Sequence, residues 1–220
     1  MRTMGFFSSI LNLLFPPKCV FCSKILKDDS FWCSDCADNL LLAADSGKTV
    51  GEYFDFCISP LYYTGVVRKS ILRFKFRGAA SYAEAYGKIM ASCIKGNIDV
   101  KYDLISWVPL STKRKKARGY DQAMLLAMAT ALELDDIAVE TLVKSKHVRA
   151  QSELSGKDER AKNISEAFCV ADIEIIKDKT ILLIDDIITT ASTLEECAKE
   201  LIGGGAAKVI CVALAKATHS

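Results

Sequence analysis

The sequence has little net charge, few histidines and no apolar run of membrane-spanning length, and each scarcity excludes a class of protein. Its 29 lysines and arginines nearly balance 27 aspartates and glutamates, so the net charge of +2 predicts no general attraction to nucleic acid or membranes. The two histidines, His147 and His219, form no obvious catalytic triad.

The apolar N-terminal stretch, FFSSILNLLF, occupies only residues 6–15. A bilayer-spanning helix needs about 20 such residues, and no small-residue cleavage site of a signal peptide follows. We therefore expect a short amphipathic helix packed on the body and no stable membrane insertion. Transient contact with the inner face of a membrane remains an open alternative.

The chain of 220 residues is long enough for one sizeable domain with a small appendage. Four of its nine cysteines are grouped, and the other five are scattered among apolar neighbours as small buried side chains: Cys57, Cys93, Cys169, Cys197 and Cys211. This usage favours a reducing, cytoplasmic compartment over a secreted disulfide scaffold.

Hydrophobic patterns divide the chain into an N-terminal unit at 1–48 and a larger domain at 49–220. Runs typical of strands lie at 54–63, 102–110, 138–143, 180–185 and 207–215. Helical patterns lie at 66–76, 82–95, 122–134 and 192–202. Their alternation predicts an α/β domain with a mostly parallel sheet, which binds ligands beyond the carboxyl ends of its strands.

The stretch ILLIDDIITTASTLEEC, residues 181–197, places two carboxylates, Asp185 and Asp186, at such a strand end. Vicinal sugar hydroxyls, with or without Mg²⁺, would offset the repulsion between these neighbours. The following helix start offers unpaired N–H groups and a partial positive charge that suit a phosphate, together with a turn made of Thr189, Thr190, Ala191, Ser192 and Thr193. The combination indicates a site for a ribose 5-phosphate. A capped helix after a strand that ends in two aspartates is the alternative.

The four grouped cysteines form two CxxC pairs, CVFC and CSDC, made of Cys19, Cys22, Cys33 and Cys36. Four thiolates at this spacing can surround Zn²⁺ tetrahedrally, and a closed site of this kind is structural. The metal would supply folding energy that a unit of this size lacks. A redox dithiol pair is the alternative reading.

Residues 181–197 resemble the signature of type I phosphoribosyltransferases, which bind phosphoribosyl pyrophosphate (PRPP). The resemblance implies that Asp185 and Asp186 are the catalytic carboxylates, hold the ribose 2′- and 3′-hydroxyls and act with Mg²⁺, while Thr189–Thr193 bind the 5′-phosphate. With the cysteine unit in front, nearly the whole chain resembles the ComF family of bacterial competence proteins. That implies a type I phosphoribosyltransferase fold, mostly parallel sheet flanked by helices, with a small N-terminal zinc unit held by four cysteines.

Three further segments carry the ComF resemblance. VPLSTKRKKARGYDQA (108–123) contains Arg114 and Arg118, which by position would bind pyrophosphate, although Asp121 stands where the family usually has asparagine. LRFKFRG (72–78) adds Lys75 as a phosphate contact. The polar segment 150–168 resembles a lid over the site, with matching residues Gln151, Arg160 and Asn163.

Three functions are compatible with these features: a transferase with an unknown acceptor, a non-catalytic PRPP- or nucleotide-binding adaptor, and a single-stranded DNA-handling protein. The resemblance favours a role in DNA uptake for natural transformation, beside a helicase-like competence protein. Few aromatic residues lie near the basic run in sequence, Trp107 and Tyr120 being the nearest, which argues against a dedicated single-strand groove there.

Overall fold

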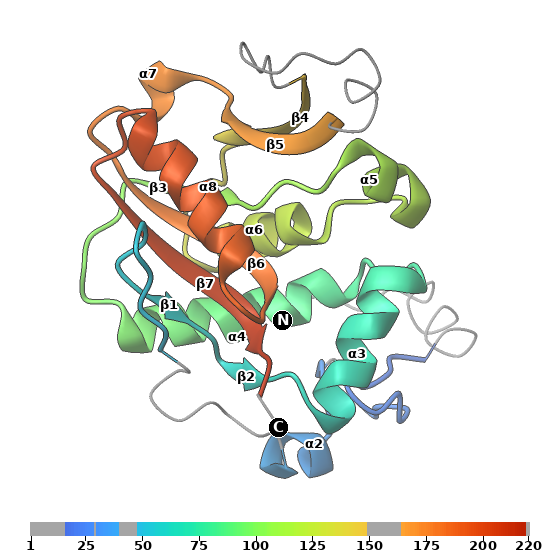
Figure 1. Cartoon of the computed structure of the whole chain (residues 1–220). Helices are drawn as coiled ribbons and strands as arrows, with labels where there is room; N and C mark the ends of the chain where they lie inside the picture. Colours follow the sequence, from blue (N-terminus) through green and yellow to red (C-terminus); the bar gives the residue numbers. More distant parts are fainter. Residues whose placement is uncertain (1–15, 29, 40–47, 149–163, 219–220) are drawn as a thin grey trace.

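A parallel sheet covered by helices on both faces forms the body of the chain (Figure 1). The structure is a computed structural model that describes residues 16–28, 30–39, 48–148 and 164–218. The sheet has five strands, which are β1 (Cys57–Ile58), β2 (Leu61–Tyr62), β3 (Leu104–Trp107), β6 (Thr180–Ile188) and β7 (Lys208–Lys216). Their order is β1-β7-β6-β3, with β2 also paired to β7, and all these pairs are parallel as the sequence predicts.

The described helices are α2 (Ser34–Asn39), α3 (Gly65–Phe76), α4 (Tyr82–Asn97), α5 (Thr112–Arg118), α6 (Gln122–Glu133), α7 (Ile173–Ile176) and α8 (Ser192–Gly203). The four predicted helices are confirmed within two residues at each end, as α3, α4, α6 and α8. Helix α5 lies in the basic segment that carries Arg114 and Arg118, for which the sequence predicted no helix. Ser111 caps it by accepting a hydrogen bond from the Arg114 N–H at 3.4 Å, and Gly119 ends it in a left-handed conformation with φ 84°.

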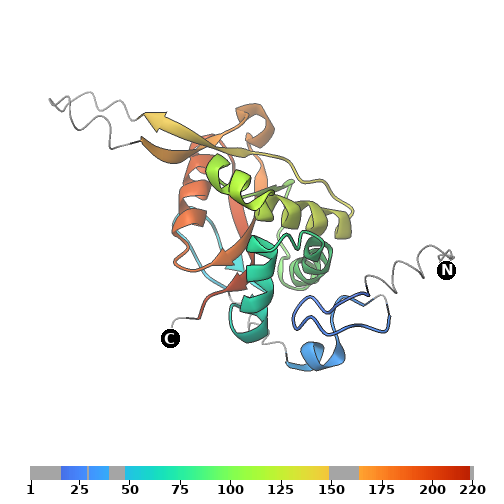
Figure 2. The same ribbon diagram turned by 90° about the vertical axis from the view of Figure 1, so that its right-hand side faces the viewer.

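Four predicted strands differ from the observed ones, and the first is the run 102–110, of which β3 covers only Leu104–Trp107. The run 54–63 forms two short strands because Pro60 interrupts it. The run 138–143 contributes one bridge between Ile105 and Ala138, after which β4 (Leu142–Val148) pairs antiparallel with β5 (Ile164–Val170) outside the main sheet. Figure 2 shows this pair projecting from the body. Strand β6 continues three residues past its predicted end at 185.

Side chains of β6 alternate between the two covered faces of the sheet. Leu182 and Ile184 belong to the core shared with α4 and α6, whereas Ile181 and Leu183 belong to the core shared with α8. Both rows are fully buried, as expected for a parallel strand covered on both sides. Continuing the alternation places Asp185 in the row that faces α8 and Asp186 in the row that faces the other layer.

The cysteine-containing unit packs against α3, on the side away from α8 (Figure 2). Val20 and Phe21 belong to the same buried core as residues of α3 and α4. The Arg73 guanidinium donates to the carbonyl oxygens of both residues, at 2.8 and 2.7 Å. The unit and the body therefore share one continuous core in the described part of the chain.

Four of the five scattered cysteines are buried, and Cys169 is partly exposed, which largely fits their prediction as apolar core residues. Burial raises the pKa of the Cys57 thiol to about 12. Across the described ranges, which omit residues 1–15, no helix is both long enough and apolar enough to cross a membrane.

Candidate functional site

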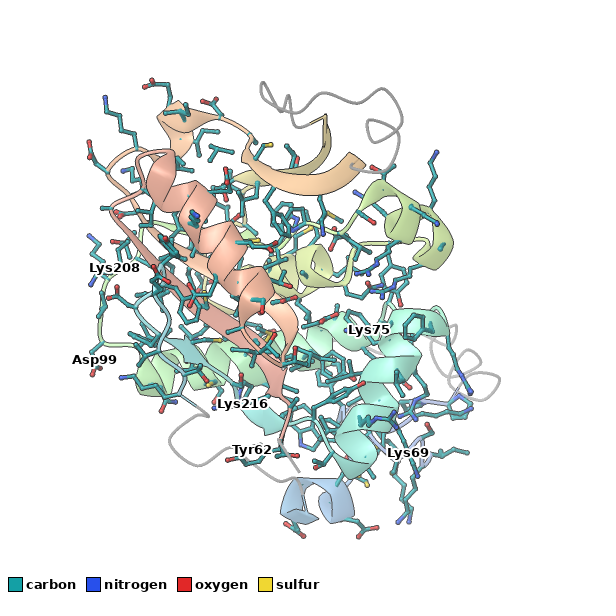
Figure 3. All side chains as sticks on the ribbon, in the orientation of Figure 1. Tyr62, Lys69, Lys75, Asp99, Lys208 and Lys216 are labelled. Carbon is teal, nitrogen blue, oxygen red and sulfur yellow. The ribbon has the colours of Figure 1, made fainter. Side chains whose placement is uncertain are left out.

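A cavity of about 450 Å³ opens where β3 and β6 end, and it gathers residues from five separate segments. Seven predicted site residues line it: Lys75, Arg114, Arg118, Asp185, Asp186, Thr189 and Thr193. Parallel strands end at the same edge of a sheet, so the loops that follow β3 and β6 converge there. Figure 3 shows Lys75 reaching from α3 toward the middle of the molecule.

The two carboxylates have different partners because they leave β6 on opposite sides. Lys75 Nζ lies 2.9 Å from Asp186 Oδ1, and both side chains are largely buried. Asp185 Oδ1 instead accepts a hydrogen bond from the Asp186 backbone N–H at 2.7 Å. Burial and the nearby Asp186 carboxylate raise the pKa of Asp185 to about 8, although that N–H and Lys75 act in the opposite direction. The Asp185 carboxyl therefore keeps its proton to a higher pH than an ordinary aspartate does.

The turn after β6 presents backbone and hydroxyl donors at the start of α8. Ala191, the N-cap residue, has φ 62° and ψ −5°, a left-handed conformation that is uncommon for a residue with a Cβ. No side chain caps the helix. The hydroxyls of Thr190 and Ser192 lie 2.9 Å apart, while Thr189 and Thr193 line the cavity. Unpaired N–H groups at this end suit an anion.

The basic helix α5 supplies the opposite wall. The Arg118 guanidinium donates to Gln122 Oε1 at 2.7 Å and lies 4.8 Å from the centre of the Phe76 ring. Arg118 is therefore held in place before any ligand arrives. Arg114 is exposed, although it also lines the cavity.

Sequence reasoning did not single out two charged residues that line the cavity, Asp121 and Lys144. Asp121 was noted only as a departure from the family pattern. It is 3% exposed, and its carboxylate accepts from the Leu110 N–H at 2.9 Å and the Met124 N–H at 3.2 Å. Lys144 lies 4.5 Å from the centre of the Phe168 ring. A single lysine in a polar segment has no sequence signal that would mark it as part of a site.

The lining residues include four basic and three acidic side chains. The cavity therefore accepts anionic groups at its arginine side and hydroxyl groups at its carboxylate side. Three predicted lid residues, Gln151, Arg160 and Asn163, lie outside the described residues.

The four grouped cysteines meet at a second, separate site. Their sulfur atoms all lie within 4.8 Å of one another, and the Sγ atoms of Cys22 and Cys33 are 3.6 Å apart. Four thiolates bound to one tetrahedral Zn²⁺ are separated by roughly 3.8 Å, because each Zn–S bond is about 2.3 Å long. The arrangement fits a closed structural zinc site. It is the one such cluster among the described residues.

Two known protein families match this chain, one over its C-terminal part and one over the cysteine-containing unit. Residues 121–220 match the family described as phosphoribosyl transferase domain, and residues 10–55 match the double zinc ribbon domain. Competence protein ComFC of Bacillus subtilis (strain 168) is 27% identical over 188 residues, which cover 83% of this chain and 68% of that protein. The chain therefore resembles competence proteins of the ComF type over most of its length.

A second relative is competence protein F of Haemophilus influenzae, strain Rd, at 38% identity over 115 residues. That match covers 50% of this chain and 48% of the relative, so the chain spans about half the length of this second protein. A ribose-phosphate pyrophosphokinase of Clostridium tetani is 32% identical over 121 residues, or 54% of this chain and 36% of that enzyme.

Similarity to solved structures is weak. The structure described as the allosteric regulatory enzyme of purine biosynthesis has 18% identity and a TM-score of 0.42, covering 61% of this chain and 26% of that one. A hypoxanthine phosphoribosyltransferase from Staphylococcus aureus has 12% identity and a TM-score of 0.39, covering 64% and 69%. The two family matches and the parallel sheet together identify a type I phosphoribosyltransferase fold with an N-terminal zinc ribbon, as the sequence predicts.

Proposed function

We propose that this protein binds PRPP in the cavity and transfers its phosphoribosyl group to an acceptor that remains to be identified. One observation carries the proposal: the carboxylate pair, the turn before α8 and the arginines of α5 line the same cavity. These three groups are suited to the three parts of PRPP, namely the ribose hydroxyls, the 5′-phosphate and the pyrophosphate.

In the proposed reaction a nucleophile on the acceptor forms a bond to the ribose anomeric carbon as the bond to pyrophosphate breaks. The pyrophosphate leaves with the electron pair of that bond, and Arg114 and Arg118 neutralise its charge. Asp185 and Asp186 hold the sugar while positive charge develops on the ring, which fixed electrostatic groups stabilise. Mg²⁺ would accompany the pyrophosphate.

Calorimetric titration of the zinc-loaded protein with PRPP, with and without Mg²⁺, tests ligand binding. We expect micromolar binding by the native protein and its loss in the double variant Asp185→Asn, Asp186→Asn. Lys69→Met is the matched control, because Lys69 is an exposed residue elsewhere on α3 (Figure 3). Equal binding by the double variant, or no binding by the native protein, would contradict the proposal.

Pyrophosphate release tests turnover. A panel of purine, pyrimidine and other nitrogen acceptors would be supplied with PRPP and Mg²⁺, and release above that without an acceptor would identify a transferase. Binding without release under every condition would instead support the adaptor function.

We also propose a role in DNA uptake, because two relatives are named as competence proteins; the helicase-like partner comes from the family resemblance alone. Its test is genetic. Replacement of the native gene by the Asp185→Asn, Asp186→Asn allele should lower the frequency of transformation if the cavity serves DNA uptake. An unchanged frequency would separate the cavity from that role.

A second candidate function, contact with single-stranded DNA, is favoured by one aromatic residue. Phe76 is 62% exposed and lies under the Arg118 guanidinium, beside the exposed lysines of α5. Bases stack on such aromatic faces while basic side chains follow the phosphates. From the sequence, only aromatic residues near the basic run were considered as stacking positions for single-stranded DNA. Phe76 was not among them, because it is far from α5 along the chain.

Binding of a fluorescent oligonucleotide at several salt concentrations tests this candidate. Phe76→Ala and the triple variant Lys113→Gln, Lys115→Gln, Lys116→Gln should each weaken binding, and the triple variant should also reduce its salt dependence. Unchanged affinity in both variants would exclude this surface.

A further inference from the structure

The ion pair between Lys75 and Asp186 is the most buried one among the described residues. Its two side chains are 16% and 13% exposed, whereas in every other described pair both partners are at least 36% exposed. Lys75 lies in the last turn of α3, 111 positions from Asp186 in the sequence, so only the docking of α3 brings them together. From the sequence alone, Lys75 was expected to contact a phosphate group of the ligand.

The geometry of β6 explains why this pair forms. Asp186 follows the row of Leu182 and Ile184, which faces the layer that contains α3, while Asp185 faces α8. Lys75 therefore reaches one carboxylate and leaves the other to the backbone N–H of Asp186. A charged pair in such a sheltered place interacts more strongly than one on the surface.

We propose that the Lys75 ammonium group is the cation bound to the acidic pair. It occupies the position beside Asp186 that a divalent cation would need in order to bind there. Mg²⁺ binds carboxylate oxygens, and here Asp186 Oδ1 is already engaged by an ammonium group. Before a metal ion could bind there, the Lys75 ammonium group would have to move away from the largely buried Asp186 carboxylate and break this ion pair. The acidic pair is thus closed to metal while Lys75 is in place.

The consequence for ligands rests on the proposed function. An ammonium group has three N–H donors, so Lys75 can contact Asp186 and still donate to sugar hydroxyl oxygens. The ribose end of the cavity would then accept a sugar phosphate without Mg²⁺. Only the pyrophosphate of PRPP would require the metal.

The charge balance of the cavity agrees with this inference. Besides Lys75, three basic side chains line it, against three acidic ones, so a further dication would add to an existing excess of positive charge. The facing charged groups are Asp121 and Arg118 from the loop and helix after β3, and Lys144 from β4.

Mn²⁺ alone, added to the zinc-loaded chain, tests the inference without a sugar ligand. Electron paramagnetic resonance measures the free ion. We expect Lys75→Met to bind one Mn²⁺ at least about tenfold more tightly than the native chain, and the added change Asp186→Asn to abolish that site. Lys75→Arg, which keeps the charge, and Lys69→Met should resemble the native chain.

Equal Mn²⁺ affinity in the native chain and Lys75→Met would overturn the inference. So would tight Mn²⁺ binding by the native chain that Asp186→Asn removes. Circular dichroism and zinc content would show that each variant is folded.

A second measurement uses only the native chain, so it does not depend on how the variants fold. Ribose 5-phosphate is titrated in metal-free buffer and again with Mg²⁺. Affinities within about twofold of each other support the inference, and binding that requires Mg²⁺ overturns it. If ribose 5-phosphate fails to bind in both buffers, the proposed function is wrong, while the Mn²⁺ comparison still decides the role of Lys75.

Discussion

Ala191 carries backbone strain at the start of α8. Its φ of 62° is one that glycine adopts freely and that costs alanine roughly 1–2 kcal/mol. Glycine loses more conformational entropy on folding, which offsets part of this difference. We expect Ala191→Gly to raise the free energy of unfolding by about 0.5–1 kcal/mol, measured by urea titration. A destabilised variant would mean that the methyl group of Ala191 contributes packing that outweighs the strain.

The hydrogen bonds of Asp121 explain why this chain has an aspartate where the ComF family usually has an asparagine. Each carboxylate oxygen accepts one backbone N–H, from Leu110 and from Met124. An asparagine amide has one acceptor oxygen, so Asp121→Asn would leave one buried N–H facing the NH₂ group. We expect a loss of about 1–2 kcal/mol in unfolding free energy. Asp99→Asn, at an exposed position, is the control and should have little effect.

Asp185 should make stability fall as pH rises. Its pKa is raised to about 8 in the folded chain, against 3.8 ordinarily. Between these values the folded chain holds a proton that the unfolded chain has released, so stability decreases with rising pH across this range. Asp185→Asn removes the effect while keeping an acceptor for the Asp186 N–H.

Urea titration of both proteins from about pH 5 to pH 8 measures this effect. The unfolding free energy of Asp185→Asn, relative to the native chain, should grow across the range. A difference that stays constant with pH would show that Asp185 is not the titrating group.

Helix α3 joins the zinc unit to the cavity. In the last turn of this helix, Arg73 donates to the carbonyls of Val20 and Phe21, and Lys75 reaches Asp186. The Tyr120 hydroxyl, which follows α5, also donates to the carbonyl of Phe74. This helix therefore positions three neighbouring parts of the molecule at once.

Removing the Arg73 contacts should loosen the zinc unit. Arg73→Met would leave two carbonyl oxygens without their charged donor, and we expect a loss of about 2 kcal/mol or more in unfolding free energy. Zinc should also pass faster to a chelating dye. Arg68→Met, on an exposed part of α3, serves as the control. Equal rates of zinc transfer in the two variants would show that Arg73 does not hold the unit.

The parts of the site that were predictable from sequence are those whose residues are contiguous. The acidic pair, the hydroxyl turn and the two CxxC pairs each lie within one short stretch, where spacing alone indicates the chemistry. The partner of Lys75 was not predictable, because it depends on how α3 docks against β6. Phe76 and Arg118 meet for the same kind of reason.

Helices and strands were predictable from the sequence where the local hydrophobic pattern agrees with how the segment packs or pairs in the fold. The amphipathic helices α3, α4, α6 and α8 were therefore predicted correctly. Strand β6 was predicted too short, because two aspartates normally mark the end of a strand. Strand β7 runs on beside it, and the residues from Asp185 to Ile188 pair with the stretch from Ala213 to Lys216. A partner strand can override local propensity in this way.

The continuous core predicts that the zinc unit and the body unfold together. Buried side chains of the unit, among them Cys19 and Phe21, belong to the same cluster as Phe74 and Tyr86 of the body. Loss of the metal should weaken this shared core. We expect Cys22→Ser, a change at an exposed ligand, to lower the melting temperature by several degrees in a single calorimetric transition. Two separate transitions would indicate that the parts fold independently.

Strand β7 pairs with β1, β2 and β6, yet it occupies residues 208–216, about 150 positions after β1. A nascent chain leaving the ribosome would therefore expose β1, β2 and β6 without their common partner until β7 is made. Contacts between such distant segments form slowly, and uncovered strands are prone to aggregate. The central place of a late strand thus delays completion of the sheet until β7 has been made, and a chaperone that shields the unfinished sheet would protect the chain until then.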